Sequence, residues 1–290
     1  MNVAAAFKTY FLLTKPNVWW LLAFTGATGV LAAANGFPEP VLFTKAVVAI
    51  TLGVAGTEAV SNYLERSLDA VMKRTSRRVL PQGLIKPAWK ALAFGMVLMA
   101  LSLLLAFSIN WMAFFFIATG MFDYLVVYVL WAKKRTPLNI VLGSYAGGAP
   151  LMAGYTSVSF WPTPEAWILA ALIVLWIPPH IWSLALIYKE DYSRAHVPML
   201  PVVTSENTAI RCIASTTVIS VLFTFLLYFL HPEKYGLIYL LAAALSGAAL
   251  ILPSLALMIS PSKRTAYMLF KLTSPQLLII MLAVIVENLV

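Results

Sequence analysis

The sequence predicts an all-α integral membrane protein, with about nine transmembrane helices around a central cavity. Two observations lead to this prediction. Hydrophobic residues make up 61% of the 290 residues, and the mean hydropathy is +0.87. Charged residues make up only 11%, whereas soluble domains carry about 25%. Such a composition is typical of a chain that lies in a bilayer.

Apolar stretches long enough to cross a bilayer recur along the whole chain. A spanning helix needs about 20 mostly apolar residues, and nine stretches meet this requirement: 17–34, 41–62, 88–107, 111–131, 138–156, 165–187, 211–230, 235–259 and 267–288. Their short connections leave no room for a soluble domain, so we expect residues 1–290 to form a single membrane-embedded domain. We expect no cleavable signal peptide, because Lys8 and Lys15 precede the first span and no cleavage pattern follows it.

Basic residues gather on one side of the predicted spans. All 20 Lys and Arg residues except Lys45 and Lys234 lie in the N-terminal segment, in the connections after spans two, four, six and eight, or in the first turns of the spans that follow these connections. Basic connections stay on the cytoplasmic side of a membrane. We therefore expect a cytoplasmic N-terminus in a cell membrane, and we explain the net charge of +9 by topology rather than by nucleic-acid binding.

Four oxygen-bearing side chains recur at helical spacing around the end of the second span. Intervals of four, three and four residues separate Glu58, Asn62, Glu65 and Asp69. On a continuous helix they would fall within an arc of roughly 60°. Carboxylate and amide oxygens suit Mg²⁺, which takes one or two protein carboxylates and completes its shell with water and phosphate. The alternative is a solvated helix end that pairs with Arg66 and Arg74.

Basic residues follow this stripe directly. The stretch SNYLERSLDAVMKRTSRRVLPQG, residues 61–83, contains Arg66, Lys73, Arg74, Arg77 and Arg78. Arg side chains bind phosphate oxygens through two parallel donors, and Lys offers a point charge. Carboxylates, a metal ion and cations at one membrane edge predict a site for a diphosphate whose hydrophobic tail lies in the membrane.

A second polar cluster lies in WIPPHIWSLALIYKEDYSRAHVPMLPVV, residues 176–203. His180 and Asp191 fall on one helix face there, and Pro178-Pro179 should break or kink the sixth span just before the histidine. Two roles remain open for His180: a hydrogen-bonded packing residue, or a ligand or proton-transfer group. The connection WAKKRTPLNIVLGSYAGGAP adds three cations, and its glycines favour close helix packing.

Five segments of the chain resemble the UbiA-type superfamily of membrane prenyltransferases, and within it the branch that acts on heme. They are TKPNV, NYLERSLDAVMKRTSRRVLPQG, KKRTPLNIVLG, PPHIWSLAL and DYSRAHVPMLPVV, in this order. The superfamily's first acidic motif falls on Ser61, Asn62, Glu65 and Asp69. The chain departs from the family pattern at Glu65, which replaces an aspartate, and at Ser67, which replaces an acidic residue.

The resemblance implies a reaction and a set of site residues. Farnesyl diphosphate and heme B would give heme O and diphosphate, with Glu65, Asp69 and Asp191 as catalytic residues. It implies Mg²⁺ bound by Asn62, Glu65, Asp69 and Asp191. It implies substrate contacts from Asn62, Arg66, Lys73, Arg74, Arg77, Lys133, Arg135, Lys189 and Tyr128. His180 would face the heme and is a candidate axial ligand, since imidazole suits iron.

The resemblance also implies partners and leaves alternatives. Partners would be the lipid bilayer and, after the reaction, a heme A synthase or a terminal oxidase assembly. The nearest alternative is a UbiA-type enzyme that prenylates a quinone precursor or a lipid. A more distant one is a transporter, in which the intramembrane residues Glu58 and Asp123 would relay protons.

Overall fold

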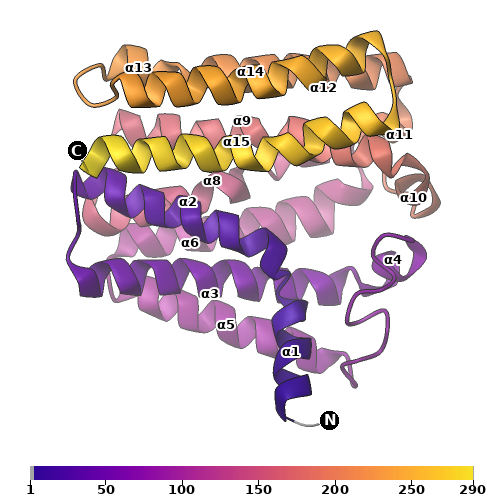
Figure 1. Cartoon of the computed structure of the whole chain (residues 1–290). Helices are drawn as coiled ribbons and strands as arrows, with labels where there is room; N and C mark the ends of the chain where they lie inside the picture. Colours follow the sequence, from indigo (N-terminus) through magenta and orange to yellow (C-terminus); the bar gives the residue numbers. More distant parts are fainter. Residues whose placement is uncertain (1–2, 290) are drawn as a thin grey trace.

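The chain forms a bundle of long helices that run side by side (Figure 1). The computed structural model describes residues 3–289. In chain order its elements are α1 (Val3–Leu13), α2 (Pro16–Ala34), α3 (Pro40–Leu64), α4 (Arg66–Val71), α5 (Trp89–Phe107), α6 (Trp111–Phe122), the π-helix η1 (Asp123–Trp131), the 3₁₀ turn η2 (Ala132–Lys134), α7 (Asn139–Leu142), α8 (Tyr145–Val158), α9 (Pro164–Ile187), α10 (Lys189–Arg194), α11 (Leu200–Val203), α12 (Glu206–Thr224), α13 (Leu226–Leu230), α14 (Leu237–Ile259) and α15 (Lys263–Leu289).

Eight helical stretches within residues 3–289 are long and apolar enough to cross a bilayer. They coincide with eight of the nine expected spans and confirm the all-α membrane fold. Four of them begin with a side-chain cap. Glu39 accepts the N–H groups of Val41 and Leu42 at the start of α3, and Asn110, Thr163 and Ser205 cap α6, α9 and α12 in the same way.

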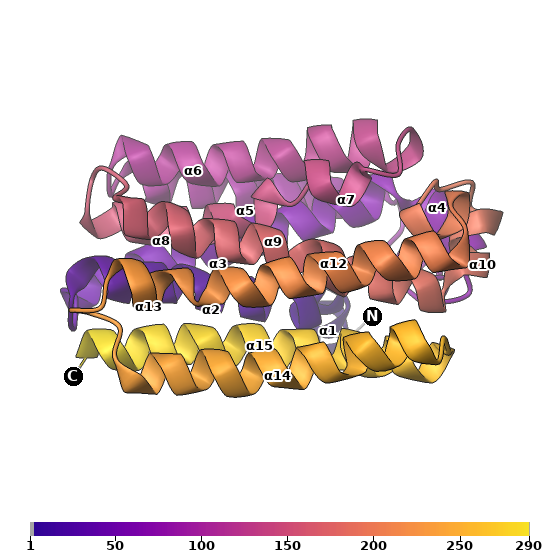
Figure 2. The same cartoon turned by 90° about the horizontal axis from the view of Figure 1, so that it is seen from above.

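The expected span 138–156 is divided in the structure into α7 and α8. The chain leaves helical geometry between them at Gly143, and α8 has only 14 residues. The two pieces still lead from the end of the bundle near α4 and α10 back to the opposite end, as Figure 2 shows. Nine membrane crossings therefore remain a prediction.

Helices from both halves of the chain enclose a central space. Residues of α2, α3, α6, α8, α9 and α15 line it, and neighbouring pairs among them pack together: α2 with α3 and α8, α8 with α6 and α9, and α15 with α9 and α2. α5 packs on the outside of α3, and α12 and α14 pack outside α9 and α15. The predicted central cavity is confirmed. α4 and α10 lie at one end of the bundle, which we call the charged end (Figures 1 and 2).

Close helix contact explains the glycines of the third basic connection. A Cβ on Gly148 would lie 3.0 Å from the carbonyl oxygen of Ala170 on α9, and one on Gly143 would lie 2.7 Å from the Cβ of Tyr128. Only a residue without a side chain lets these backbones approach so closely. The packing interpretation of these glycines agrees with the structure.

α9 runs without interruption through Pro178 and Pro179. The helix does not break at these prolines, and a kink there stays a prediction. Each proline removes one helical N–H donor, but α9 packs against α8, α12 and α15 along its length. Trp176 also donates an indole hydrogen bond of 2.8 Å to the carbonyl of Thr273 on α15. We infer that this packing keeps the segment helical.

A buried ionic cluster holds the opposite end of the bundle together. Glu165, at the start of α9, is 7% exposed. It pairs with Lys234 at 2.8 Å and accepts a hydrogen bond from the hydroxyl of Tyr235. Lys234 also donates to the carbonyl of Ala32 on α2 at 3.1 Å. The cluster thus joins α2, α9 and the connection before α14, far from the charged end.

Candidate active site

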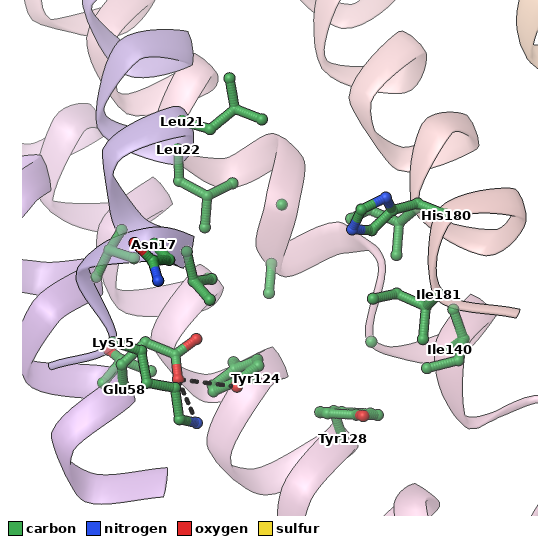
Figure 3. Close-up of a pocket in the computed structure, with 18 of the residues that line it drawn as sticks. Lys15, Asn17, Leu21, Leu22, Glu58, Tyr124, Tyr128, Ile140, His180 and Ile181 are labelled. Atoms are coloured by element: carbon green, nitrogen blue, oxygen red, sulfur yellow. Dashed lines mark hydrogen bonds and ion pairs between the residues drawn. The ribbon is translucent and has the colours of Figure 1, made fainter. Parts of the chain in front are cut away.

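A cavity of about 540 Å³ occupies the centre of the bundle. Its inner walls are mostly apolar, with Leu21, Ile50, Met121, Trp176 and Leu277 among the lining residues. Charged side chains line it toward the charged end, where α4 and the following turn contribute Asp69, Arg74 and Arg78. Figure 3 shows part of the wall, with residues from α2 and α3 facing residues from η1 and α9. The cavity therefore has a charged mouth and an apolar interior.

The acidic stripe is bent rather than straight. α3 ends at Leu64, and Glu65 connects it to α4, so the expected continuous helix over residues 58–69 was wrong. Glu58, Glu65 and Asp69 nevertheless line the same cavity. Asn62 does not: its amide nitrogen donates hydrogen bonds to the carbonyls of Leu13, at 2.6 Å, and Glu58, at 3.2 Å. Because the chain turns at Glu65, α4 places Asp69 at the mouth of the cavity.

Each carboxylate at the mouth has its own cation. Glu65 pairs with Lys133 of η2, and both oxygens of Asp69 accept hydrogen bonds of 2.9 Å from Arg78. Burial would raise the pKa of Glu65, but the nearby ammonium groups of Lys133 and Lys15 outweigh it and hold that pKa below its ordinary value. Burial would likewise lower the pKa of Arg78, but Asp69 outweighs it and raises that pKa. The mouth is therefore a set of charged pairs.

The π-helix η1 and the turn η2 that follows it carry three cavity residues. Tyr124, Tyr128 and Lys133 are separated by four and five residues, and all three line the cavity. Because π-helical hydrogen bonds join residue i to i+5, this helix winds more widely than an α-helix, and residues four to five apart align on one face. The Tyr124 and Tyr128 rings lie 5.6 Å apart, and the Lys133 ammonium lies 5.2 Å from the Tyr128 ring centre.

The second acidic segment meets the first through Arg74. Oδ2 of Asp191 accepts the backbone N–H of Arg74 at 2.9 Å, and Oδ1 pairs with Arg194. The Arg74 guanidinium donates to the hydroxyl of Tyr192 at 3.3 Å. Burial would raise the pKa of Asp191, but these N–H donors and Arg194 hold it below its ordinary value. Asp191 itself does not line the cavity among the described residues, whereas Arg74 and Tyr192 do.

His180 presents one ring nitrogen to the cavity. Its ring stacks between Trp176 and Phe270, with centroid distances of 4.5 and 4.6 Å. Nδ1 lies 2.6 Å from the hydroxyl of Thr273, and that hydroxyl donates its only proton to the carbonyl of Phe270, also at 2.6 Å. With this assignment of the hydroxyl proton, we infer that Nδ1 carries the ring proton and that Nε2 has the lone pair. Figure 3 shows the ring pointing into the pocket from α9.

Deeper on the α3 wall lies Glu58, a member of the acidic stripe that the resemblance did not include among the site residues. Oε2 of Glu58 accepts hydrogen bonds from the Lys15 ammonium at 2.7 Å, the Ser61 hydroxyl at 3.2 Å and the Tyr124 hydroxyl at 3.3 Å. Lys15 stands between α1 and α2 with a positive φ of 52°. The sequence signals were present, since Glu58 is the first member of the acidic stripe and Lys15 belongs to TKPNV.

The structure brings together about half of the predicted site residues. Those that line the cavity are Glu65, Asp69, Arg74, Tyr128, Lys133 and His180. Arg66, Lys73, Arg77 and Arg135 are exposed at the charged end, and Lys189 is half-buried there. Arg66 stacks over Tyr63 and Arg135 donates to two backbone carbonyls of η1. Other lining residues include Lys15, Asn17, Glu58, Arg78, Tyr124 and Tyr192; of these, Glu58 belongs to the predicted acidic stripe and Arg78 to the predicted basic stretch.

Comparison with known proteins identifies the family. The model of the UbiA prenyltransferase family matches residues 22–275. The chain belongs to this family. A protoheme IX farnesyltransferase of Desulforudis audaxviator is 42% identical over 97% of this chain and 88% of its own length. One from Thermoplasma volcanium is 39% identical over 96% of this chain and 97% of its own.

Solved structures share the fold of this UbiA family member. A structure from work on digeranylgeranylglyceryl phosphate synthase has a TM-score of 0.79 at 22% identity, covering 97% of this chain and 98% of that one. A UbiA homologue from Archaeoglobus fulgidus bound to DMAPP and Mg²⁺ has a TM-score of 0.68 at 16% identity, covering 96% and 99%. The chain is accordingly a multi-pass membrane protein.

The carboxylates at the mouth of this UbiA family member suit a divalent ion that shares its ligands with a substrate. Within residues 3–289 no three His, Cys, Asp or Glu side chains come close enough to form a metal site alone. Glu65 and Asp69 nevertheless both line the cavity, and Mg²⁺ commonly uses one or two carboxylates plus phosphate. Asp191 and Asn62, by contrast, are not among the described residues that line the cavity. We therefore infer that Glu65 and Asp69 alone would supply the protein ligands of a Mg²⁺ ion.

Proposed function

We propose that the protein transfers the farnesyl group of farnesyl diphosphate to a vinyl group of heme B and so produces heme O. The observation that carries this proposal is the cavity, which joins paired charges at its mouth to an apolar interior that His180 enters. The identity of 42% to a protoheme IX farnesyltransferase supports the same substrates. Residues 1–290 would act as one membrane-embedded domain, since both halves of the chain line the cavity.

The mouth would hold the diphosphate. Lys133, Arg74 and Arg78 line it and can donate to phosphate oxygens. Glu65 and Asp69 would hold Mg²⁺, which when bound neutralises charge on the leaving diphosphate. Asp191 fixes the backbone of Arg74 and would act as a positioning residue. The exposed cations Arg66, Lys73, Arg77 and Arg135, with Lys189, would raise the local concentration of the anionic substrate.

The interior would shape the reaction of the farnesyl chain. Its apolar walls exclude bulk water, which would otherwise capture the allylic cation that forms when the diphosphate leaves. The Tyr124 and Tyr128 rings lie between the mouth and the interior along η1, and aromatic faces stabilise a nearby cation. The protein thus keeps the cation away from water until the acceptor reacts.

His180 would orient the heme. Its Nε2 carries a lone pair and faces the cavity, while Thr273 holds Nδ1. A neutral imidazole fixed in this way is a good ligand for iron. Coordination of the iron by Nε2 would hold the porphyrin in the interior, with a vinyl group directed toward the farnesyl carbon.

The experiment that tests this function uses the purified protein in lipid nanodiscs with farnesyl diphosphate and Mg²⁺. Heme B, an aromatic acid and a glycerol-based lipid alcohol are supplied as separate acceptors, and products are identified by mass spectrometry. We expect a farnesylated, hydrated heme from heme B, and loss of activity after chelation of Mg²⁺. Prenylation of the aromatic acid or the lipid, with none of heme B, would show that the alternative acceptor classes are correct.

The charged end would face the cytoplasm of a cell membrane, because basic residues concentrate there. Exposed cations at this end include Lys73 and Arg77 after α4 and Lys263 at the start of α15. Membrane-impermeant thiol labelling of single cysteines placed at Ser76 and at Glu233, in a chain whose Cys212 is replaced by Ser, tests the orientation. We expect Glu233→Cys to react in intact cells, and Ser76→Cys only after lysis.

A further inference from the structure

Glu58 is an ionisable group on the cavity wall to which the proposed diphosphate and heme contacts give no role. It is 5% exposed and lies within the membrane-spanning helix α3. A carboxylate inside a membrane is costly, and such residues usually serve a function. We propose that Glu58 is a catalytic residue that binds and deprotonates the water molecule that adds to the farnesylated heme. This inference rests on the proposed function.

The two oxygens of Glu58 have different surroundings. Oε2 accepts from Lys15, Ser61 and Tyr124. Oε1 accepts no hydrogen bond from residues 3–289. It is also not among the fully buried polar atoms that lack a partner, so its surface is accessible. Since Glu58 lines the cavity, Oε1 is open to it, as Figure 3 shows. The three donors fix the carboxylate through Oε2 and leave Oε1 free to accept a hydrogen bond from a water molecule in the cavity.

The depth of Glu58 matches the reacting carbon. It lies seven residues before Glu65 on α3, which corresponds to about 10 Å along the helix. The mouth residues would hold the diphosphate, and the bond that breaks is at the inner end of this group. The first farnesyl carbon therefore lies deeper than Glu65, toward Glu58. The heme vinyl group must reach that same carbon.

The step balances without any oxidant or reductant. Diphosphate leaves with the electron pair of the carbon–oxygen bond, and the vinyl π electrons form a bond to the first farnesyl carbon. The inner vinyl carbon, next to the porphyrin ring, is then electron-deficient. A lone pair of water forms the new carbon–oxygen bond there, and one proton of that water passes to Oε1 of Glu58. The product carries a hydroxyl group and one farnesyl chain.

Other polar groups at this depth are poorer proton acceptors. The Lys15 ammonium has no lone pair, and the Tyr124 hydroxyl already donates to Glu58. His180 would use Nε2 on iron. An ion pair that serves only to hold α2 against α3 would not need an oxygen open to the cavity, and it would not affect which product forms.

The test compares wild type, Glu58→Gln and Asp123→Asn in nanodiscs with farnesyl diphosphate, heme B and ¹⁸O-labelled water. Without a base for water, the electron-deficient carbon intermediate loses a proton and gives a farnesylated alkene lacking the elements of water. We expect the ratio of hydrated to dehydrated product to fall about 100-fold in Glu58→Gln, which matches the loss of a general base. Asp123→Asn removes another buried membrane carboxylate, which binds the Ala146 N–H at 2.9 Å, and should keep the wild-type ratio.

Several outcomes would overturn the inference. An unchanged product ratio in Glu58→Gln, with or without a lower rate, assigns Glu58 a structural role. If the hydroxyl oxygen of the product does not come from labelled water, the reaction needs no base to deprotonate water. If Glu58→Gln does not accumulate in membranes, Glu58→Ala with added formate replaces it, and formate must then restore the hydrated product. Failure of the proposed function is distinguishable, because wild type would then form no farnesylated heme at all.

Discussion

The backbone N–H of Arg74 donates a hydrogen bond of 2.9 Å to Oδ2 of Asp191, 117 residues further along the chain. This contact joins the turn after α4 to α10, and it places the Arg74 guanidinium over Tyr188 and Tyr192, at 5.5 and 5.9 Å from their ring centres. Asp191 of the second acidic segment thus holds Arg74 in place at the cavity mouth and does not itself line the cavity.

Asp191→Asn tests this supporting role. The amide oxygen can still accept the Arg74 N–H, but the charge pair with Arg194 is lost. We expect the KM for farnesyl diphosphate to rise about tenfold, a loss of about 1.4 kcal/mol, with kcat and the Mg²⁺ requirement nearly unchanged. Steady-state kinetics at several Mg²⁺ concentrations measure this, with the exposed Glu190→Gln as control. A higher Mg²⁺ requirement in Asp191→Asn would instead make Asp191 a metal ligand.

Lys133 and Lys134 are neighbours with different surroundings. Lys133 lines the cavity and pairs with Glu65, whereas Lys134 is exposed. We expect Lys133→Met to lower kcat about 100-fold or more, the size of the effect when one donor to a developing charge is removed. Lys134→Met should stay near the wild-type kcat. Equal losses in the two variants would mean that the mouth needs only general positive charge.

Replacing His180 should separate the binding of the two substrates. We expect His180→Phe to lose the heme absorbance band of an imidazole-ligated iron and to weaken heme binding at least tenfold. Binding of farnesyl diphosphate should be unchanged, because the mouth lies on other elements. Visible spectroscopy and isothermal titration measure the two. Unchanged heme spectra in His180→Phe would return this residue to a packing role.

Glu65 makes stability depend on pH. Its pKa is lower in the folded protein than the ordinary 4.5, so its ion pair stabilises the fold above that pH. The contribution is lost as pH falls through the lower, folded-state pKa. Glu65→Gln leaves Lys133 unpaired and should cost about 3 kcal/mol at neutral pH. We expect the difference in thermal unfolding between wild type and Glu65→Gln to shrink below pH 4.5, while the exposed Glu206→Gln differs little from wild type throughout. A difference independent of pH contradicts this.

The cluster at the opposite end should affect stability without affecting chemistry. Lys234→Met leaves the buried Glu165 without its cation and should cost about 3 kcal/mol of unfolding free energy. We expect kcat to stay near that of wild type at low temperature, because the cluster does not line the cavity. Thermal unfolding and activity measured on the same sample check both parts. A large fall in kcat at full folding would connect this end to the active site.

The length of the apolar stretches and the positions of the charged residues sufficed to predict most of the fold. Eight spans follow from apolar stretches alone, because a stretch of about 20 apolar residues crosses lipid as a helix, in which all backbone hydrogen bonds are internal. The acidic stripe led to the correct cavity wall because Glu65 and Asp69 lie at its end. Spacing could not predict that the chain turns at Glu65, because this turn depends on long-range contacts such as Lys133 with Glu65.

The site contacts that could not be predicted from the sequence are those between residues far apart in the chain. Lys15 precedes Glu58 by 43 residues, and no local pattern joins them. Asp191 shares a helical spacing with His180, yet the end of α9 at Ile187 and the new helix α10 turn it toward Arg74. A pattern assigns a residue to one face of a helix only while that helix continues.

The wide winding of η1 determines how a deletion or substitution in this segment would affect the position of Lys133. Deleting a single residue between Tyr128 and Lys133 would let the segment relax to ordinary α-helical winding, and Lys133, then four residues from Tyr128, would stay on the cavity face. Substitutions that convert η1 to an α-helix without a deletion would instead leave the two residues five apart, about 140° from each other around the helix. The membrane crossing would survive, but the ammonium group that is proposed to contact the diphosphate would point away from the cavity.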